Sequence, residues 1–176
     1  MLSELHTKHI VYRDLKPENL VVCKKTGRVC LVDFGFAKDL HKIGRTFTKC
    51  GTPGYSAPEI LLQVDEDTNE MKRRIQKLNS VGYSYPCDVW SWGVLLCELT
   101  GGCNPFSSGT KSITEIFDNI LNVRVNWPRN ITFNCKELLK RVFERESLFR
   151  ITIPEIKKHP FFNVSPMNKQ SRELTG

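Results

Sequence analysis

The chain has 176 residues, of which 40% are hydrophobic and 26% charged, the balance of an ordinary soluble globular domain. This length is enough to bury a core without disulfide or metal staples, and no apolar run approaches the roughly 18 residues of a membrane span. The net charge of +7 favours acidic or phosphate-bearing partners. Because the basic residues are dispersed and no nucleic-acid-binding signature accompanies them, we expect no nucleic-acid partner.

The seven cysteines are scattered and form no C-x-x-C pair, so the sequence predicts neither a disulfide framework nor a zinc site. Most of them lie in apolar stretches, and we expect small buried thiols of a reducing compartment. The residues after Met1 mix polar and apolar types instead of forming an apolar run, which predicts no secretory signal. We therefore expect a cytoplasmic location.

The first elements expected along the chain are short. Residues 1–9 have the pattern of the end of a helix. Two β-like runs, at 20–23 and 29–32, are separated by a turn that contains Thr26-Gly27, and they predict a hairpin. Residues 36–56 have no sustained period and predict a long loop, a kind of segment that usually carries function.

Helices dominate the remaining sequence, which therefore predicts a mainly α fold with a small β-hairpin region. Residues 86–100 are apolar on every helix face, the mark of a central buried helix, and Gly101-Gly102 are expected to end it. A polar insertion at 63–82 is expected to form a solvated surface segment, or alternatively to dock a regulator. The other expected segments are helices at 57–62, 112–122, 135–144 and 153–159, and a polar, frayed tail at 163–176.

Three short motifs occur in order along the chain. Residues 12–19 are Y-R-D-L-K-P-E-N, residues 33–35 are D-F-G and residues 57–59 are A-P-E. The protein-kinase signature is H-R-D-L-x-x-x-N, then D-F-G, then A-P-E, so only Tyr12 departs from it, at the position of the His. A lone D-F-G would be weak evidence, but three matches in order at workable spacing are strong.

On these motifs the chain resembles the C-terminal lobe of a eukaryotic serine/threonine protein kinase. The Y-R-D form, the D-F-G-F-A-K run at 33–38 and the T-F-T-K-C-G-T-P run at 46–53 further resemble the cyclic-nucleotide-dependent branch of the AGC group. The resemblance implies a protein-kinase-like C-lobe, an α+β kinase fold without its N-lobe. It covers residues 1–162 as one partial kinase domain, interrupted by the insertion at 63–82.

The resemblance implies that Asp14 and Lys16 are catalytic, and that Lys16, Asn19 and Asp33 bind the cofactors ATP and Mg²⁺. Asp14 would accept the proton of the substrate hydroxyl or orient that hydroxyl, and Lys16 would lie near the transferred phosphate of ATP. Asn19 and Asp33 supply oxygen ligands of the kind that Mg²⁺ prefers. These residue types suit phosphoryl transfer, which is catalysed by positioning and charge stabilisation.

The loop between the second and third motifs is the implied activation loop. Thr48 resembles the activating phosphorylation site, and Arg13 and Lys38 would hold its phosphate. This implies an upstream activating kinase or another regulatory partner. Thr52 resembles the residue whose hydroxyl ties this loop to the catalytic loop and borders the substrate.

Substrate choice is implied by acidic positions. Glu18 and Glu98 match carboxylates that receive a basic substrate side chain, so we expect protein substrates with Arg shortly before the Ser or Thr. Two residues depart from the family pattern. Lys49 replaces an apolar residue of the pocket after the phosphoacceptor, and Gly54 replaces an acidic residue that some relatives use for a more distant Arg.

Three more residues resemble structural positions of the kinase frame. Glu59 and Arg150 resemble a buried ion pair that joins the activation segment to the late helices. Asp88 resembles the residue that accepts backbone N–H groups of the catalytic loop, and a charge at the head of so apolar a helix needs such partners.

No G-x-G-x-x-G loop and no V-A-I-K-like run occurs in the 176 residues, although kinases use both to bind ATP. We therefore expect these residues alone to lack kinase activity. A non-catalytic kinase-like scaffold, or pseudokinase fragment, that binds substrates or regulators is the main alternative to an enzyme. A basic nucleic-acid-binding protein is the weakest alternative, and a steep salt dependence of binding would distinguish it.

Overall fold

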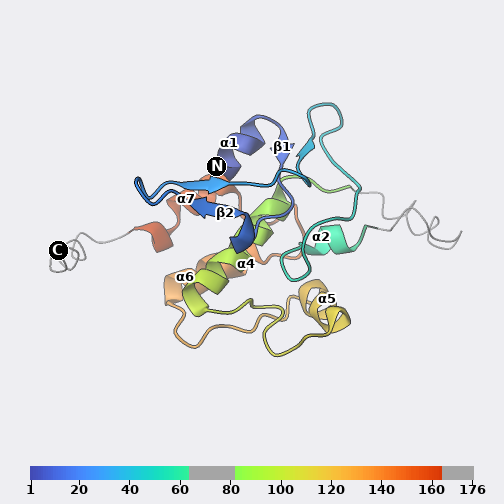
Figure 1. The fold of residues 1–176 in the computed structure, drawn as a ribbon. Helices are drawn as coiled ribbons and strands as arrows, with labels where there is room; N and C mark the ends of the chain where they lie inside the picture. Colours follow the sequence, from blue (N-terminus) through green and yellow to red (C-terminus); the bar gives the residue numbers. More distant parts are fainter. Residues whose placement is uncertain (64–81, 164–176) are drawn as a thin grey trace, which may run out of the picture.

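The computed structural model describes residues 1–63 and 82–163, so the expectations for the insertion and the tail fall almost wholly outside the described residues. Within these ranges the protein is largely helical and carries two small antiparallel sheets of two strands each (Figure 1). This agrees with the predicted mainly α fold that has a small β region.

The amino-terminal part of the chain builds a helix, a turn and a hairpin. Helix α1 (Leu2–Thr7) leads through strand β1 (Ile10–Val11) and the 3₁₀ turn η1 (Pro17–Asn19) into β2 (Leu20–Val22), which pairs with β3 (Val29–Leu31). The connection closes because Gly27 adopts a φ of +66° and its amide donates to the Cys23 carbonyl at 2.8 Å. The expected hairpin is confirmed.

The long loop expected over 36–56 is tied down at two places. Strand β4 (Lys38–Asp39) pairs antiparallel with β1, and Thr46 forms an isolated bridge with Tyr83. The expectation of a plain loop was therefore incomplete. A strand of two residues is too short to show an alternating pattern, so the sequence offered no signal for it.

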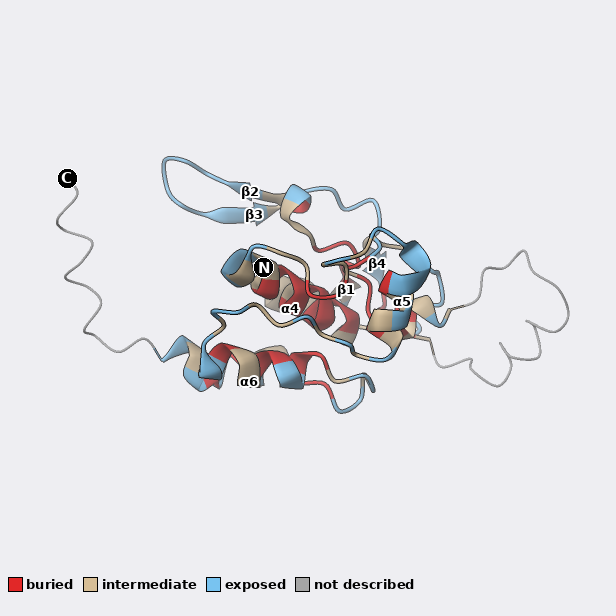
Figure 2. Cartoon of the chain, turned by 90° about the horizontal axis from the view of Figure 1, so that it is seen from below, coloured by how far each residue is buried: buried red, intermediate tan, exposed pale blue. Residues whose placement is uncertain are grey.

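Helix α4 (Pro86–Gly101) runs through the middle of the molecule and is its most buried helix (Figure 2). Its Trp90 is fully buried and packs against Phe106 and Phe143, each with ring centroids 5.2 Å away. Gly93 lets the helix that carries Val142 approach closely, because a Cβ at position 93 would lie 2.3 Å from a methyl of Val142. The helix ends as predicted, at Gly102 in the left-handed region with φ +75°.

Shorter helices surround α4, namely α2 (Pro58–Leu61), α5 (Ile113–Leu121), α6 (Phe133–Val142) and α7 (Ile153–Lys158), followed by the 3₁₀ turn η2 (Pro160–Phe162). The helix predicted at 135–144 lies two residues earlier in the structure. The Thr132 hydroxyl accepts from the Cys135 amide at 3.3 Å and so starts α6 at Phe133. The α5 and α7 helices also begin at capping residues, Ser112 and Thr152.

The cysteines are all free thiols, and the expectation that most of them are buried was wrong. Three are buried, two are half-buried and two are exposed: Cys87, Cys97 and Cys135, then Cys50 and Cys103, then Cys23 and Cys30. The exposed pair belongs to the hairpin β2–β3, which projects from the body of the molecule (Figure 2). Apolar neighbours in sequence did not imply burial there, because a projecting hairpin has few neighbours in space.

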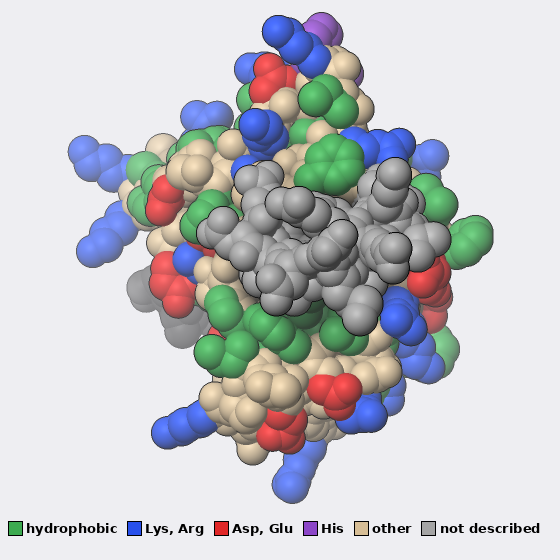
Figure 3. Space-filling view, turned by 90° about the vertical axis from the view of Figure 1, so that its right-hand side faces the viewer, with side chains coloured by type: hydrophobic (Ala, Val, Ile, Leu, Met, Phe, Trp, Pro, Cys, Tyr) green, Lys and Arg blue, Asp and Glu red, His purple; other side chains and the backbone are tan. Residues whose placement is uncertain are grey.

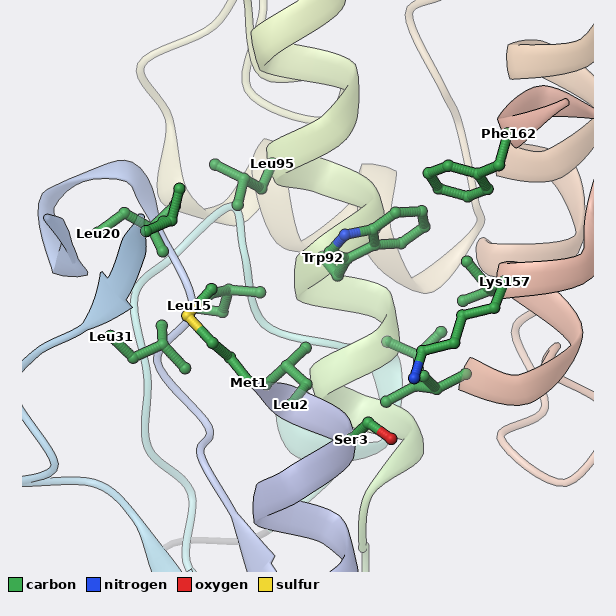
Figure 4. Close-up of a pocket in the computed structure, with 14 residues that line it drawn as sticks. Met1, Leu2, Ser3, Leu15, Leu20, Leu31, Trp92, Leu95, Lys157 and Phe162 are labelled. Atoms are coloured by element: carbon green, nitrogen blue, oxygen red, sulfur yellow. The ribbon is translucent and has the colours of Figure 1, made fainter. Parts of the chain in front are cut away.

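One face of the hairpin borders an apolar cavity of about 360 Å³ that also touches α1, α4 and α7 (Figure 4). Leu2, Leu15, Leu31 and Trp92 are among the side chains that line it. Beyond this cavity the hairpin carries exposed apolar side chains, with Val22 58% exposed. The hairpin therefore presents apolar side chains to solvent.

The charged side chains show no single stripe on the face seen in Figure 3, where Lys and Arg lie scattered around the edge among acidic groups. On this face the basic side chains are dispersed, as they are along the sequence. Among the residues that the structure describes, no helix combines the length and the apolar character needed to cross a membrane.

Candidate active site

The predicted catalytic loop, residues 12–19, is bonded to the first turn of α4. The carboxylate of Asp88 is fully buried, with one oxygen accepting from the Arg13 amide at 2.8 Å and the other from the Tyr12 amide at 2.9 Å. A buried charge requires such donors. Arg13 adopts a φ of +71°, a backbone conformation that residues other than glycine rarely take. The two bonds from Asp88 thus fix an unusual turn immediately before Asp14.

Asp14 is 4% exposed and lies at the centre of a hydrogen-bonded cluster. Its Oδ1 accepts from the Thr52 hydroxyl at 2.7 Å, and its Oδ2 lies 2.8 Å from Lys16 Nζ and 2.9 Å from Asn19 Nδ2. Lys16 Nζ also donates to the Thr52 hydroxyl at 2.8 Å. The structure therefore brings together four residues that the sequence singled out, from the catalytic loop and from the activation loop.

Tyr12 links the catalytic loop to the D-F-G segment. Its buried hydroxyl donates to the Val32 carbonyl at 2.5 Å, and its ring meets the ring of Phe34 edge to face at 5.4 Å. Burial, followed by the charges of Asp14 and Asp33, raises the pKa of Tyr12 to about 12. The phenol therefore remains a protonated donor over the physiological pH range.

Asp33 stands apart from this cluster. It is exposed, has a φ of +57°, and its Oδ1 accepts from the Gly35 amide at 3.0 Å. Its neighbour Val32 donates its amide to the Asn19 carbonyl at 3.0 Å, so the chain segments of the two predicted metal ligands lie side by side.

The donor set fits Mg²⁺. The amide nitrogen of Asn19 is committed to Asp14, which leaves its amide oxygen and the Asp33 carboxylate as metal-binding atoms. No cluster of three or more His, Cys, Asp or Glu suited to a metal occurs among residues 1–63 and 82–163. Mg²⁺ commonly takes only one or two protein ligands and completes its shell with water and phosphate oxygens, so this sparse set suits it.

The activation loop is held through Arg13 and Tyr83. The Arg13 guanidinium donates to the Phe36 carbonyl at 2.5 Å and lies 3.1 Å from the Tyr83 hydroxyl and 3.4 Å from the Thr46 hydroxyl. The Tyr83 hydroxyl in turn donates to the Thr48 carbonyl at 2.5 Å. Arg13 thus reaches the backbone of the predicted phosphorylation site through one tyrosine, which sequence reasoning missed.

The side chains of the predicted phosphate-binding set differ in exposure. Thr48 and Lys38 are exposed, and Lys38 lies in β4, whereas Arg13 is 8% exposed. The predicted phosphate cradle of Arg13 and Lys38 stays a prediction.

One predicted substrate-binding residue, Glu98, has a hydrogen-bond partner that the sequence did not predict. Glu98 lies in α4, and the Tyr55 phenol donates to its carboxylate. Burial, then this hydrogen bond and the charges of Glu98 and Glu18, raise the pKa of Tyr55. Tyr55 therefore stays a donor and stabilises a carboxylate that the apolar helix would otherwise disfavour. The sequence carried no signal for this partner.

The two departures from the family pattern lie near this pair in sequence. Lys49 is exposed on the activation loop. Gly54 has a φ of +89°, and its carbonyl accepts from the side-chain Nδ2 of Asn104 at 3.2 Å. A side chain at position 54 would therefore be strained by the backbone as well as crowded by Asn104, whose Nδ2 would lie 3.3 Å from its Cβ.

Glu59 and Arg150 form a two-pronged ion pair between α2 and the segment before α7, with N···O distances of 2.5 and 2.9 Å. The Arg150 side chain is fully buried, also donates to the Pro86 carbonyl at 2.9 Å, and lies 5.1 Å from the centre of the Trp90 ring. The pair therefore ties α2 to the amino-terminal end of α4.

An aspartate held beside a lysine and a threonine, followed by an exposed aspartate, is the arrangement that the three motifs predicted. Comparison with known proteins agrees: the chain belongs to the protein kinase domain family, which matches residues 1–162. Its homologues include serine/threonine kinases and cyclic-nucleotide-dependent kinases, as the sequence resemblance indicated.

Three relatives illustrate the match. A cGMP-dependent protein kinase of Drosophila melanogaster (isozyme 2, forms cD5/T2) is 40% identical over 166 residues, which are 90% of this chain and 16% of that protein. A cAMP-dependent protein kinase catalytic subunit-like protein of Caenorhabditis briggsae is 36% identical, covering 92% of this chain and 37% of its own length. Protein kinase 2 of Dictyostelium discoideum is 35% identical, covering 98% and 32%. The chain thus spans well under half of the length of each.

Proposed function

We propose that the protein is a serine/threonine kinase that transfers the γ-phosphoryl group of Mg·ATP to protein hydroxyls, acting together with an N-terminal lobe. The observation that carries the proposal is the cluster around Asp14, whose two carboxylate oxygens are held by Thr52, Lys16 and Asn19. Families that use this constellation catalyse by positioning, and the cluster positions one carboxylate from three directions.

In this mechanism Asp14 orients the substrate hydroxyl and accepts its proton, as a positioned general base does. Lys16 places a positive charge beside that carboxylate, where charge on the transferred group develops. Asn19 and Asp33 would hold Mg²⁺, which when bound neutralises phosphate oxygens. Thr52 connects the activation loop to Asp14, so the order of that loop affects the orientation of the base.

The proposed substrates are proteins with Arg shortly before the phosphoacceptor. Glu98 supports this preference for Arg, because it is a half-buried carboxylate that accepts a hydrogen bond from the neutral phenol of Tyr55. A guanidinium group pairs strongly with a carboxylate. Glu18 is exposed in the catalytic loop and close enough to Tyr55 for its charge to affect that phenol. Phosphorylation of Thr48 by another kinase is the proposed regulation.

A non-catalytic scaffold is the second candidate, favoured by one observation. The hairpin and the D-F-G segment expose apolar side chains, with Val22 58% and Phe34 49% exposed, which suits binding to another protein surface. On this view the retained Asp14 cluster reflects descent from an enzyme and has no current catalytic role.

The test compares the kinase with its N-terminal lobe, residues 1–176 alone, and the Asp14→Asn variant of each. We expect Asp14→Asn to lower turnover of an arginine-containing peptide by at least about a hundredfold, because general-base catalysis contributes roughly 10²–10⁴ in rate. The peptide KM should change little. Residues 1–176 alone should incorporate no more phosphate than their own Asp14→Asn control.

Equal turnover of wild type and Asp14→Asn in the lobe-containing kinase would remove Asp14 from the mechanism and favour the scaffold. Activity of residues 1–176 clearly above their control would show that ATP can be bound and aligned without a Gly-rich loop.

A further inference from the structure

Two exposed histidines meet where the turn after α1 lies against the start of the activation loop. His9 follows α1 and His41 follows β4. Their imidazole rings meet edge to face, with centroids 4.9 Å apart. They come from different segments of the chain, and the proposed kinase mechanism uses neither of them.

The backbone holds these two histidines close together. Strands β1 and β4 pair with Ile10 opposite Asp39, and just beyond this pair the Leu40 amide donates to the His9 carbonyl at 2.8 Å. The His41 amide donates to Oδ1 of Asp39 at 2.7 Å, which sets the direction of the chain after β4. The contact between the rings therefore follows from two backbone segments that are bonded to each other.

The spacing of the two rings suits a single metal ion. Zinc lies about 2.0–2.1 Å from an imidazole nitrogen and so about 3 Å from the ring centre, which puts two rings on one tetrahedral ion roughly 5 Å apart. The separation of 4.9 Å in this structure matches that spacing. Imidazole nitrogen suits Zn²⁺, Ni²⁺ and Cu²⁺, whereas Mg²⁺ and Ca²⁺ take oxygen ligands. The pair therefore differs in chemistry from the proposed Mg²⁺ ligands.

A hydrogen bond of His9 selects the nitrogen that is left for an ion. Its Nδ1 lies 3.3 Å from the Tyr85 hydroxyl, so an Nδ1–H group would donate to that oxygen and leave the lone pair on Nε2. Metal-binding histidines commonly use their second nitrogen in this way, which fixes the tautomer and the ring. Within residues 1–63 and 82–163 the His41 ring has no hydrogen-bond partner, so its nitrogens are not committed elsewhere.

We propose that His9 and His41 bind one divalent transition-metal ion of the Zn²⁺ type, which cross-links the turn after α1 to the start of the activation loop. Water completes the coordination, because no group of three or more His, Cys, Asp or Glu suited to a metal occurs in the described part of the chain. With half of the ligands of a structural zinc site, the pair should bind Zn²⁺ with a Kd on the order of tens of micromolar. This site is independent of the proposed kinase function.

Binding is measured by isothermal titration of tag-free residues 1–176 with Zn²⁺. His9→Gln and His41→Gln should each weaken binding at least about tenfold. The double variant should be little worse than either single variant, because one remaining imidazole cannot chelate the ion. Both positions are exposed, and far-UV circular dichroism checks that each variant keeps its helices. Mg²⁺ should show no binding that depends on the two histidines.

Exposed thiols also bind zinc, so the titration is repeated with Cys23→Ser and Cys30→Ser combined. Binding that depends on the histidines should stay within about threefold in this background, because neither thiol belongs to the proposed site. Zinc binding that disappears with the two thiols and is unchanged by both histidine variants would overturn the proposal. So would the absence of any binding tighter than about 1 mM.

The cross-link is measured by hydrogen exchange of the Leu40 amide, which bonds to the His9 carbonyl. Zn²⁺ at ten times its Kd should slow this exchange about tenfold, because the pairing then opens only in the metal-free fraction. The effect should be absent in His9→Gln. The Phe143 amide, which bonds to the Leu139 carbonyl at the end of α6, is the control and should not respond. Unchanged exchange at Leu40, or equal slowing at Phe143, would contradict the cross-link.

Discussion

The two aspartates of the proposed mechanism, Asp14 and Asp33, lie in opposite surroundings. Asp14 is 4% exposed and is contacted by Thr52, Lys16 and Asn19. Asp33 is exposed, and its recorded side-chain hydrogen bond is to Gly35, two residues along the chain. The Asp14 loop is bonded to buried α4, whereas Asp33 follows a hairpin whose residues are mostly exposed (Figure 2).

This difference separates two tasks of a kinase. The part proposed to orient the substrate hydroxyl is held by long-range contacts to α4 and the activation loop. Of the two predicted metal ligands, Asn19 belongs to the Asp14 cluster, whereas Asp33 has a conformation supported mainly by local bonds. Substitutions that disturb the Asp14 part and spare the exposed Asp33 part, or the reverse, therefore test this difference.

The largest expected effect concerns the framework beneath Asp14. Arg150→Met should lower the free energy of unfolding by about 3–5 kcal/mol, because it leaves Glu59 in a largely buried site without its partner. Arg124→Met is the control, since Arg124 and Asp118 form an exposed pair worth at most about 1 kcal/mol. Urea unfolding of residues 1–176 measures both. Similar losses for the two variants would mean that burial of the pair adds nothing.

The next effect concerns the link between the two parts. Arg13 contacts the Phe36 carbonyl on one side and Tyr83 on the other, so a phosphate on Thr48 that it bound would order both. Arg13→Ala should remove most of the activity gained on Thr48 phosphorylation, with a coupling free energy of about 1–3 kcal/mol to Thr48→Ala. Kinase assays on the four members of the cycle measure it. Additive effects would show that Arg13 does not receive that phosphate.

A smaller effect is expected at the substrate-binding side of the ordered part. Glu98→Ala should lower the preference for Arg before the phosphoacceptor roughly tenfold, the value of one charge-assisted hydrogen bond. Tyr55→Phe removes the hydroxyl group of Tyr55 but leaves the Glu98 carboxylate, so it should preserve the preference for Arg. A peptide array read with both variants is the measurement. A profile without basic enrichment, or one that Glu98→Ala leaves unchanged, contradicts the assignment.

The smallest effect is expected on the exposed side. Val22→Thr should change the free energy of unfolding of residues 1–176 by less than about 0.5 kcal/mol, because Val22 is 58% exposed. The matched change Val94→Thr, at a fully buried position of α4, should cost about 1–3 kcal/mol through burial of a hydroxyl. Comparable losses would show that the hairpin is packed in solution and would remove the contrast.

The sequence was most informative where one physical signal was strong over many residues. The all-round apolar pattern predicted α4, and the ordered motifs predicted a set of residues that the structure gathers around Asp14. Local signals such as Thr26-Gly27 predicted the hairpin. These features depend on short-range chemistry that a sequence displays directly.

The sequence was least informative about partners that are distant along the chain. His6 meets Asp88 across 82 positions, Arg13 meets Tyr83 across 70, and Tyr55 meets Glu98 across 43. Each is a single polar contact between elements whose packing is fixed by the rest of the fold. No pattern in a single sequence therefore predicts it. The same holds for the β1–β4 pairing, in which each strand has only two residues.

The bonds between the catalytic loop and α4 have a consequence for folding during synthesis on the ribosome. Asp88 holds the amides of residues that are synthesised 76 and 75 positions earlier. At about 5–20 residues per second, those residues wait roughly 4–15 s before their anchor is even polymerised. During that interval the nascent chain presents the apolar hairpin and an unsupported loop, a state suited to chaperone capture. A message that ended before the codon of Asp88 would encode all of the proposed catalytic and metal-binding aspartates and still not place Asp14.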